Sequence, residues 1–368
     1  MASSLWSSLG ATAGTPNRGC RPVASTAVFR ENTLTAAELR ADLAGKPAAL
    51  SALAQRLSRA EPFRALPGLI EHGPSDVVFL GLGPASYAAA PAAARLELAG
   101  VHTRMESPAA VRLGPAGPDT LVVAVVVGSG QRELAAALDH YMGTAPIVLL
   151  VADPTSVLTH YADIVAALEV GQEFATSRSY QHAQALLLHL AARLGAPPAG
   201  ASSDVAVVVR RAANATADLL ERAGDWVPRL AQTLSSSSGL HLLAPLERLS
   251  SAQQGALAIR KGPVHIAHAS ETAQWSHTDR YLAAAQRYRA VLFRGSRFDE
   301  RAAEHMLQLR ARFVTVGGDL EGQAAGLRFS GDDDEDVSLL TEPLVPELLA
   351  AHWWAEREAQ AVPRTQEA

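Results

Sequence analysis

The chain has 368 residues, of which 48% are hydrophobic and 19% charged, a composition typical of a globular protein long enough for two domains. The net charge of −5 provides no basic surface for nucleic acid. No apolar run reaches the roughly 18–20 residues that a membrane helix needs, so we expect no membrane partner. The single cysteine, Cys20, excludes an intramolecular disulfide and favours a reducing cytoplasm.

The first 34 residues differ in composition from the remainder. They are rich in Ser, Ala, Thr and Gly, and residues 1–30 contain arginine but no acidic residue. A transit peptide has this composition, whereas a secretory signal would need an apolar core. We predict a disordered or extended tail over residues 1–34.

Alternating strands and helices characterise the first half. Leucines at helical spacing predict helices within 35–58, separated at Pro47, and a further short helix over 62–71. Strands are then expected at 77–80, 101–105, 121–127, 147–151 and 163–167, with helices at 86–99, 131–142 and 177–194. This order predicts a doubly wound parallel sheet, and we assign residues 35–195 to a first domain.

The second half repeats this order after a Gly/Pro/Ser-rich linker at 195–203. Strands are expected at 240–243, 290–293 and 313–316, with a short segment at 265–268, and helices at 205–223, 226–234, 250–261, 278–286, 299–311 and 343–357. We therefore predict a second domain over 205–358, a tail over 359–368, and an α/β fold of two flavodoxin-type parallel-sheet domains in tandem.

Two strand-to-helix turns in the first half are candidates for an anion site. The first is Gly81-Leu82-Gly83-Pro84-Ala85-Ser86, and the second is Gly128-Ser129-Gly130-Gln131-Arg132. Each follows a buried apolar run and opens a helix, where free backbone N–H groups and the helix dipole favour negative charge. Two such turns at one sheet edge predict a pocket for a phosphorylated small molecule.

Six short motifs occur in the order and spacing of a known family. They are Glu38-Leu39-Arg40 with Lys46-Pro47 and Leu50, Gly81–Tyr87, Gly128–Gln131, Gly171-Gln172-Glu173 with Thr176-Ser177, Gln254-Gly255-Ala256-Leu257 with Lys261, and Gln274-Trp275-Ser276-His277. With these motifs the chain resembles the double sugar isomerase (SIS) domain family. That family includes the isomerase half of glucosamine-6-phosphate synthase and bacterial phosphosugar isomerases and deaminases.

The resemblance implies a phosphate site built from hydroxyls and backbone N–H groups. Ser129 matches a phosphate-contacting serine, next to Gly130, while Arg132 stands where a hydroxyl is expected and can make a charge-assisted contact. Ala85 replaces another expected serine, which leaves Ser86 as the candidate in the first turn. Thr155 and Ser156 would form a third wall. In the alternative interpretation, the glycines only shape the turn and Ser129 caps the helix.

The catalytic positions implied by the resemblance are only partly preserved. His277 matches the histidine that opens the sugar ring, but Lys261 stands in place of the glutamate base. A lysine replaces that base only if burial lowers its pKa. Glu271 is the nearest carboxylate that could substitute, with a solvated loop or helix cap as its alternative role. Further replacements of charged family residues are Gln254, Ala258 and Gln274, and Pro363-Arg364 resembles a family tail without its terminal lysine.

The leading hypothesis is a cytoplasmic, homodimeric phosphosugar enzyme, either an aldose–ketose isomerase or an amino-sugar phosphate deaminase or deglycase. No cofactor or metal is expected, because no residue cluster has metal-ligand spacing. The replaced residues favour an alternative, a binding or regulatory protein without catalysis. A third hypothesis is a dinucleotide-binding oxidoreductase, because Gly81-x-Gly83-x-x-Ser86 opens a helix and Glu106 follows about 20 residues on.

Two further segments carry structural expectations. The acidic run 332–336 is expected to be a solvated loop, since it lacks the spacing of an EF-hand calcium site. Trp353 and Trp354 on the last helix are expected to pack against other elements or at a subunit interface.

Overall fold

The computed structural model describes residues 34–361, except Ser237 and Gln286. The predicted tail 1–34, apart from Leu34, and the motif Pro363-Arg364 lie outside the described residues. The strands are β1 Asp76–Leu80, β2 His102–Glu106, β3 Thr120–Val125, β4 Ile147–Val151, β5 Ile164–Ala167, β6 Leu240–Ala244, β7 Ala267–Glu271, β8 Arg289–Phe293, β9 Arg312–Val316 and β10 Ala325–Leu327. The helices are α1 Ala36–Ala44, α2 Lys46–Leu57, α3 Leu66–Leu69, α4 Pro84–Leu98, α5 Gln131–Tyr141, α6 Ser177–Arg193, α7 Val205–Glu221, α8 Ala223–Leu234, α9 Leu249–Lys261, α10 Thr272–Trp275, α11 Arg280–Ala285, α12 Asp299–Gln308, α13 Glu335–Thr341 and α14 Leu344–Ala361, with 3₁₀ helices η1 Val157–Tyr161 and η2 Leu246–Arg248.

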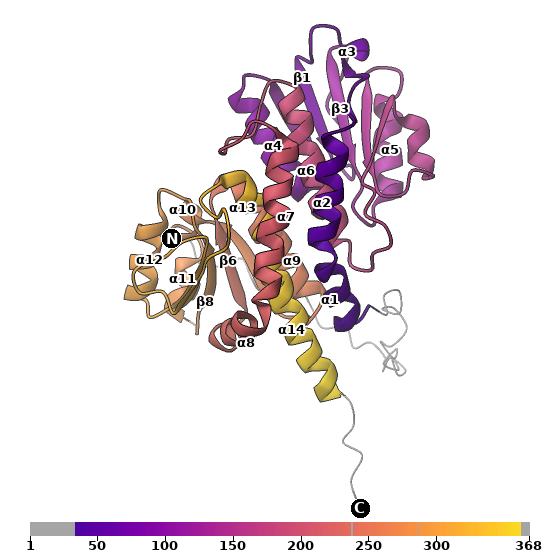
Figure 1. The fold of residues 1–368 in the computed structure, drawn as a ribbon. Helices are drawn as coiled ribbons and strands as arrows, with labels where there is room; N and C mark the ends of the chain where they lie inside the picture. Colours follow the sequence, from indigo (N-terminus) through magenta and orange to yellow (C-terminus); the bar gives the residue numbers. More distant parts are fainter. Residues whose placement is uncertain (1–33, 237, 286, 362–368) are drawn as a thin grey trace, which may run out of the picture. The chain divides into compact units, whose positions relative to one another are not determined.

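The strands form two five-stranded sheets, in which every pairing is parallel (Figure 1). The first sheet has the order β2-β1-β3-β4-β5, and the second has the order β10-β9-β8-β6-β7. Read from its other end, the second order is β7-β6-β8-β9-β10 and repeats the first. In it, β6 takes the place of β1, and β8 takes the place of β3. The predicted fold, two doubly wound parallel sheets in tandem, is confirmed.

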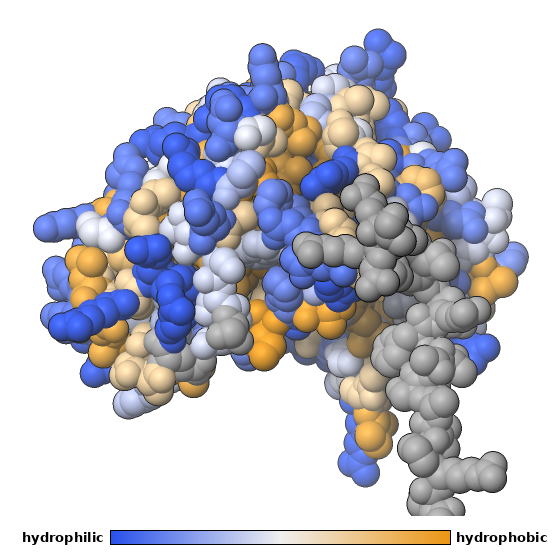
Figure 2. Space-filling model, turned by 90° about the horizontal axis from the view of Figure 1, so that it is seen from below, coloured by the Kyte–Doolittle hydropathy of each residue, from blue (hydrophilic) through white to orange (hydrophobic). Residues whose placement is uncertain are grey.

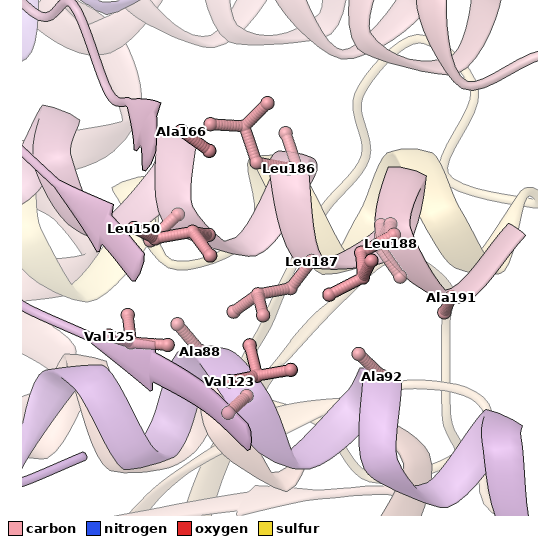
Figure 3. Close-up of a cluster of buried hydrophobic side chains, with 14 of the residues drawn as sticks. Ala88, Ala92, Val123, Val125, Leu150, Ala166, Leu186, Leu187, Leu188 and Ala191 are labelled. Atoms are coloured by element: carbon pink, nitrogen blue, oxygen red, sulfur yellow. The ribbon is translucent and has the colours of Figure 1, made fainter. Parts of the chain in front are cut away.

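The inner strands are apolar on both faces because helices cover both faces of each sheet, whereas the edge strands β2 and β7 are largely polar. All six residues of β3 are buried, and neighbouring residues of β1 enter different cores: Val77 and Phe79 lie in one, Val78 and Leu80 in the other. Figure 3 shows the first of these cores, where Val123 and Leu150 face Ala88 of α4 and Leu187 of α6. Small alanines on α4 let that helix lie close to the sheet.

Each half of the chain contributes a helix to the hydrophobic core of the other half. Leu39 and Leu43 of α1 belong to the core of the second sheet, whereas Leu339 and Leu340 of α13 belong to that of the first. Helix α2 packs along α7, and α1 packs against α14 (Figure 1). Lys46 at the start of α2 forms a fully buried ion pair with Glu347 of α14. Each sheet therefore completes its core with a helix that lies outside its own stretch of sequence.

Two local predictions were wrong. The break between the first two helices is at Gly45, not at Pro47, which lies in the first turn of α2. Proline is tolerated there because the first turn of a helix leaves its N–H groups without intrahelical partners.

The acidic run 332–336 is not a solvated loop. Asp334 caps α13 and pairs with Arg211, and Asp336 is 0% exposed and pairs with Arg95 of α4. These carboxylates also accept from the backbone of the linker at Gly200 and Ala201. Buried charges require such partners, and a linear sequence does not reveal them. The predicted packing role of Trp353 and Trp354 is confirmed, since both lie in the second-sheet core.

The exposed surface is of mixed character on the face drawn in Figure 2, where hydrophobic residues lie between hydrophilic ones. Such mixing is ordinary for the surface of a folded protein. Among the helices that the structure describes, none is both long and apolar enough to cross a bilayer.

A buried histidine leads to a prediction about pH. His241 of β6 is 3% exposed and stacks on Tyr288, with ring centroids 4.0 Å apart. Burial lowers the pKa of His241 from 6.5 to about 4, with the nearby His268 as a smaller cause. The folded state disfavours the charged imidazole, so neutral His241 contributes its full share to the free energy of unfolding above pH 6.5. That contribution is lost as the pH falls from 6.5 to about 4.

We therefore expect His241→Phe to reduce the acid sensitivity of folding. The free energy of unfolding of the wild type should fall by up to about 3 kcal/mol more between pH 7 and 4 than that of the variant. Urea unfolding at several pH values measures this difference. The control is His72→Phe, an exposed position that leaves His241 in place. Equal acid sensitivity of the wild type and His241→Phe would contradict the prediction.

Candidate functional site

The turns after β1 and β3 lie together at the carboxyl edge of the first sheet, where the chain order reverses. A Cβ placed on Gly130 would lie 3.2 Å from Cδ1 of Leu82, so the two turns are in contact. Gly128 and Gly130 have φ values of 84° and 101°, a region that other residues rarely adopt. Each turn leads directly into a helix, α4 or α5. This geometry places two helix N-termini at one edge.

A third segment, residues 173–176, closes one side of this edge. A Cβ placed on Gly128 would lie 3.3 Å from the methyl group of Thr176. Glu173 accepts hydrogen bonds from the backbone N–H groups of Arg178 and Ser179 and from the Ser179 hydroxyl. Asp42 of α1 accepts from the N–H groups of residues 174 and 175, at 2.7 and 2.6 Å. Glu173 and Thr176 had no predicted role, although their motif with Gly171 was the signal that could have indicated one.

The structure brings the predicted phosphate ligands of the two turns to this edge. Ser129 and Arg132 are exposed, Gly130 is half-buried, and the hydroxyl of half-buried Ser86 donates to the Gly83 carbonyl at 2.9 Å. Among the described residues, the backbone N–H groups of Ser129, Gln131 and Arg132 have no hydrogen-bond acceptor. Unpaired donors beside an exposed guanidinium make this edge suitable for an anion.

The predicted third wall has a different character. Asp153, after β4, accepts from both the N–H and the hydroxyl of Thr155, at 2.8 and 2.7 Å, and the hydroxyl bond is the larger cause of its lowered pKa. Ser156 is buried and its hydroxyl accepts from Leu158 N–H, which caps η1. Both hydroxyls thus take part in the local turn. Because Asp153 adds negative charge, this wall suits sugar hydroxyls better than phosphate.

Lys261 lies on α9, a helix of the second half. Helix α9 begins beside α6, where the Tyr180 hydroxyl donates to the Ser250 carbonyl at 3.3 Å, and it ends at Lys261. Partial burial lowers the pKa of Lys261, and the opposing influence is the charge of Glu173.

Glu271 and His277 lie at the other end of the second sheet. Glu271 ends β7 and caps α10, accepting from the N–H groups of Ala273 and Gln274 at 2.8 and 2.7 Å. His277 follows α10 and is exposed. Lys261 precedes β7, whose five residues span roughly 13 Å. One chain therefore does not bring Lys261 together with Glu271 and His277.

The carboxyl edge of the second sheet carries two cavities, of about 320 and 770 Å³. Both are lined by Glu247, Gly295 and Glu335, and the larger one includes Glu271. The turn after β8 corresponds to the Gly128–Gly130 turn, but a carboxylate already occupies it. Asp299 accepts from the N–H groups of Gly295 and Ser296 at 2.8 and 3.0 Å and from Arg294 at 3.0 Å. The second edge thus holds an internal anion where the first edge has unpaired donors.

Other nominated positions have structural partners. Gln254 is buried, and its amide donates to Glu347 at 3.3 Å. Glu106 accepts from Arg104, from Gly114 N–H at 3.1 Å and from the Tyr141 hydroxyl at 2.8 Å. Within the part of the chain that the structure describes, no group of three or more His, Cys, Asp or Glu residues is placed to hold a metal ion.

Comparison with solved structures places this fold among proteins that act on sugar phosphates. The C-terminal domain of glucosamine-fructose-6-phosphate aminotransferase from Francisella tularensis aligns with a TM-score of 0.72 at 13% identity, covering 86% of this chain and 96% of that one. Tagatose-6-phosphate ketose/aldose isomerase from Escherichia coli gives 0.67 at 14% identity, covering 88% and 95%. Glucosamine-6-phosphate deaminase from Thermotoga maritima gives 0.60 at 13% identity, covering 87% and 95%.

At these identities the likeness establishes the fold, and the double SIS fold implied by the motifs is confirmed. No protein-family model matches the sequence. No curated protein matches it either.

The occupied turn of the second sheet yields a prediction about stability. Asp299 is 0% exposed, so Asp299→Asn leaves Arg294 without its buried counter-charge, and a neutral amide oxygen replaces the charged acceptor of the turn's N–H groups. We expect a loss of about 2–4 kcal/mol in the free energy of unfolding, measured by urea denaturation.

The matched control is Glu300→Gln, which removes the other, exposed partner of Arg294. Its expected cost is below about 1 kcal/mol, because exposed ion pairs contribute little. Similar losses for the two variants would show that Asp299 does not hold this turn.

Proposed function

We propose that this protein binds a sugar phosphate at the carboxyl edge of the first sheet and acts on it as an isomerase or as an amino-sugar phosphate deaminase or deglycase. The observation that carries the proposal is the glycine-shaped turn Gly128-Ser129-Gly130, with its unpaired N–H groups in contact with the turn after β1. The fold it shares with proteins named for sugar-phosphate reactions supports the substrate class.

In this proposal the phosphate lies on the backbone N–H groups that begin α5. Ser129 and Ser86 would add hydroxyl contacts, and Arg132 would add a charge-assisted one. Thr155, with Asp153, would contact sugar hydroxyls, while buried Ser156 would hold the shape of that loop. Lys261 would lie over the carbonyl end of the open-chain sugar. The sugar phosphate thus extends from α5 toward the end of α9.

The positions of His277 and Glu271 support a homodimer. Both lie at the second-sheet edge, away from Lys261, so one chain does not supply a complete set of catalytic groups at the first edge. In the proposal, His277 opens the sugar ring at a site completed by a second copy of the chain, in the cytoplasm. Glu271, which already accepts two N–H bonds, would hold α10 beneath His277 rather than move protons.

The second candidate function is sugar-phosphate binding without catalysis. The observation that favours it is the engagement of the carboxylates: Glu173 accepts three hydrogen bonds, and Glu271 caps a helix. Turnover of fructose 6-phosphate or glucosamine 6-phosphate separates the two functions. Dinucleotide binding is disfavoured, because the three donors to Glu106 occupy the carboxylate that would have to bind a ribose.

The proposed phosphate site is tested by ligand-induced thermal stabilisation. Fructose 6-phosphate at about 100 times its Kd should stabilise the fold by about 2.7 kcal/mol, and unphosphorylated fructose should not. Arg132→Glu should weaken binding by about 10- to 100-fold, because it replaces an attraction to the phosphate by a repulsion.

The control variant is Arg112→Glu, an exposed charge reversal on the loop before β3. It changes the net charge by the same amount but leaves the α5 turn unchanged. Equal binding of fructose and fructose 6-phosphate, or equal effects of the two charge reversals, would refute the assignment of the site.

A further inference from the structure

The loop between β5 and α6 has an unusual backbone. Glu169, Gly171 and Thr176 have φ values of 50°, 66° and 59°, which lie in the left-handed region. That region is costly for a β-branched residue such as Thr176, so its conformation persists only where surrounding contacts hold it. The methyl group of Thr176 lies against Gly128, the first glycine of the proposed phosphate turn. The strained residue of the loop is therefore the one that contacts the proposed site.

A buried carboxylate from another helix holds this loop. Asp42 of α1 is 2% exposed, and one of its oxygens accepts from the N–H groups of residues 174 and 175 at 2.7 and 2.6 Å. Its other oxygen accepts at 3.2 Å from Arg178, whose guanidinium also donates to the Val170 carbonyl at 3.0 Å. Asp42 therefore binds the loop directly before Thr176 and, through Arg178, near its beginning.

Helix α1 is itself fixed in the second half of the chain. Leu39 and Leu43 on this helix lie in the core of the second sheet. The N–H of Ala36 donates to Glu358 of α14 at 3.1 Å. Asp42 thus joins a loop of the first half to a helix that the second half holds, and the shape of the loop depends on the packing of the two halves.

We propose that Asp42 is a positioning residue for the sugar phosphate; this rests on the proposed function. By holding residues 174 and 175, Asp42 keeps Thr176 against Gly128 and so keeps the turn in the shape whose N–H groups bind the phosphate. Because Asp42 is buried, it acts through the loop and does not contact the ligand. A displacement of about 1 Å in the groups that hold a substrate can cost about 100-fold, so loss of this contact should weaken binding.

The test is isothermal titration of the full-length protein with fructose 6-phosphate and, separately, with inorganic phosphate. Each variant is titrated at a temperature at which circular dichroism shows it to be folded. Asp42→Ala removes both acceptor oxygens and should weaken the binding of both ligands about 10- to 100-fold. Asp42→Asn keeps an oxygen for residues 174 and 175 but loses the charge that faces Arg178, so we expect a loss of about 3- to 10-fold.

The matched control is Asp299→Asn. Like Asp42, Asp299 is buried, accepts from two backbone N–H groups and pairs with an arginine, but it lies at the second-sheet turn after β8. This variant should lower stability and leave both dissociation constants within about 2-fold of the wild-type values, because distant sites act independently. Equal losses of affinity in Asp42→Asn and Asp299→Asn would show that binding follows overall stability, and would overturn the proposal.

A double-mutant cycle tests whether the effect of Asp42 passes through Thr176. Thr176→Ser keeps the hydroxyl and removes the methyl group that contacts Gly128. It should weaken phosphate binding about 5-fold in the wild type and by less than about 2-fold in the Asp42→Ala background, because residues that act through one contact are not additive. Fully additive effects would refute this route. If Asp42→Ala does not fold, Asp42→Asn takes its place in the cycle.

The outcomes separate this proposal from the proposed function. If the wild type binds fructose 6-phosphate and the folded Asp42 variants bind it equally well, Asp42 is not a positioning residue, and the proposed binding function stands. If the variants lose affinity for fructose 6-phosphate but not for inorganic phosphate, the loop does not hold the phosphate turn and the proposal fails. If the wild type binds neither ligand, both proposals fail.

Discussion

The buried ion pair between Lys46 and Glu347 is the contact on which the arrangement of the site depends. It joins α2 of the first half to α14 of the second, and Glu347 also accepts from Gln254 of α9. Burying two charges costs several kcal/mol unless both are paired and hydrogen-bonded. Arrangements of α2, α9 and α14 that separate these three side chains are therefore strongly disfavoured. Since α9 ends at Lys261, the contact that closes the core also sets where that amine lies.

The two sheet edges show how one architecture can hold an anion in two ways. At the second edge, Asp299 occupies the N–H groups of the β8 turn with a carboxylate from the chain itself. At the first edge, Gly128, Ser129 and Gly130 leave the equivalent donors unpaired among the described residues. An internal carboxylate stabilises a turn permanently, whereas unpaired donors are satisfied by water or by a ligand. In the proposal, this difference leaves the first edge free to bind a ligand, whereas Asp299 stabilises the second.

The carboxylates near the first edge are engaged with partners inside the chain. Asp153 and Glu173 are acidic, but both are held by nearby donors, and Lys261 supplies the positive group on the facing helix.

Sequence alone determined most of the strands, though not β10, and the glycine turn after β3. Apolar runs such as 147–151 bury both faces of a parallel strand, and Gly128 and Gly130 permit a turn with positive φ, so local patterns were sufficient. The tertiary structure was needed to show which half covers which core, that Asp336 is buried, and that Glu271 and His277 lie at the carboxyl edge of the second sheet. These outcomes depend on pairs more than 100 residues apart, such as Lys46 with Glu347 and Arg95 with Asp336, and no local periodicity encodes the partner of a buried charge.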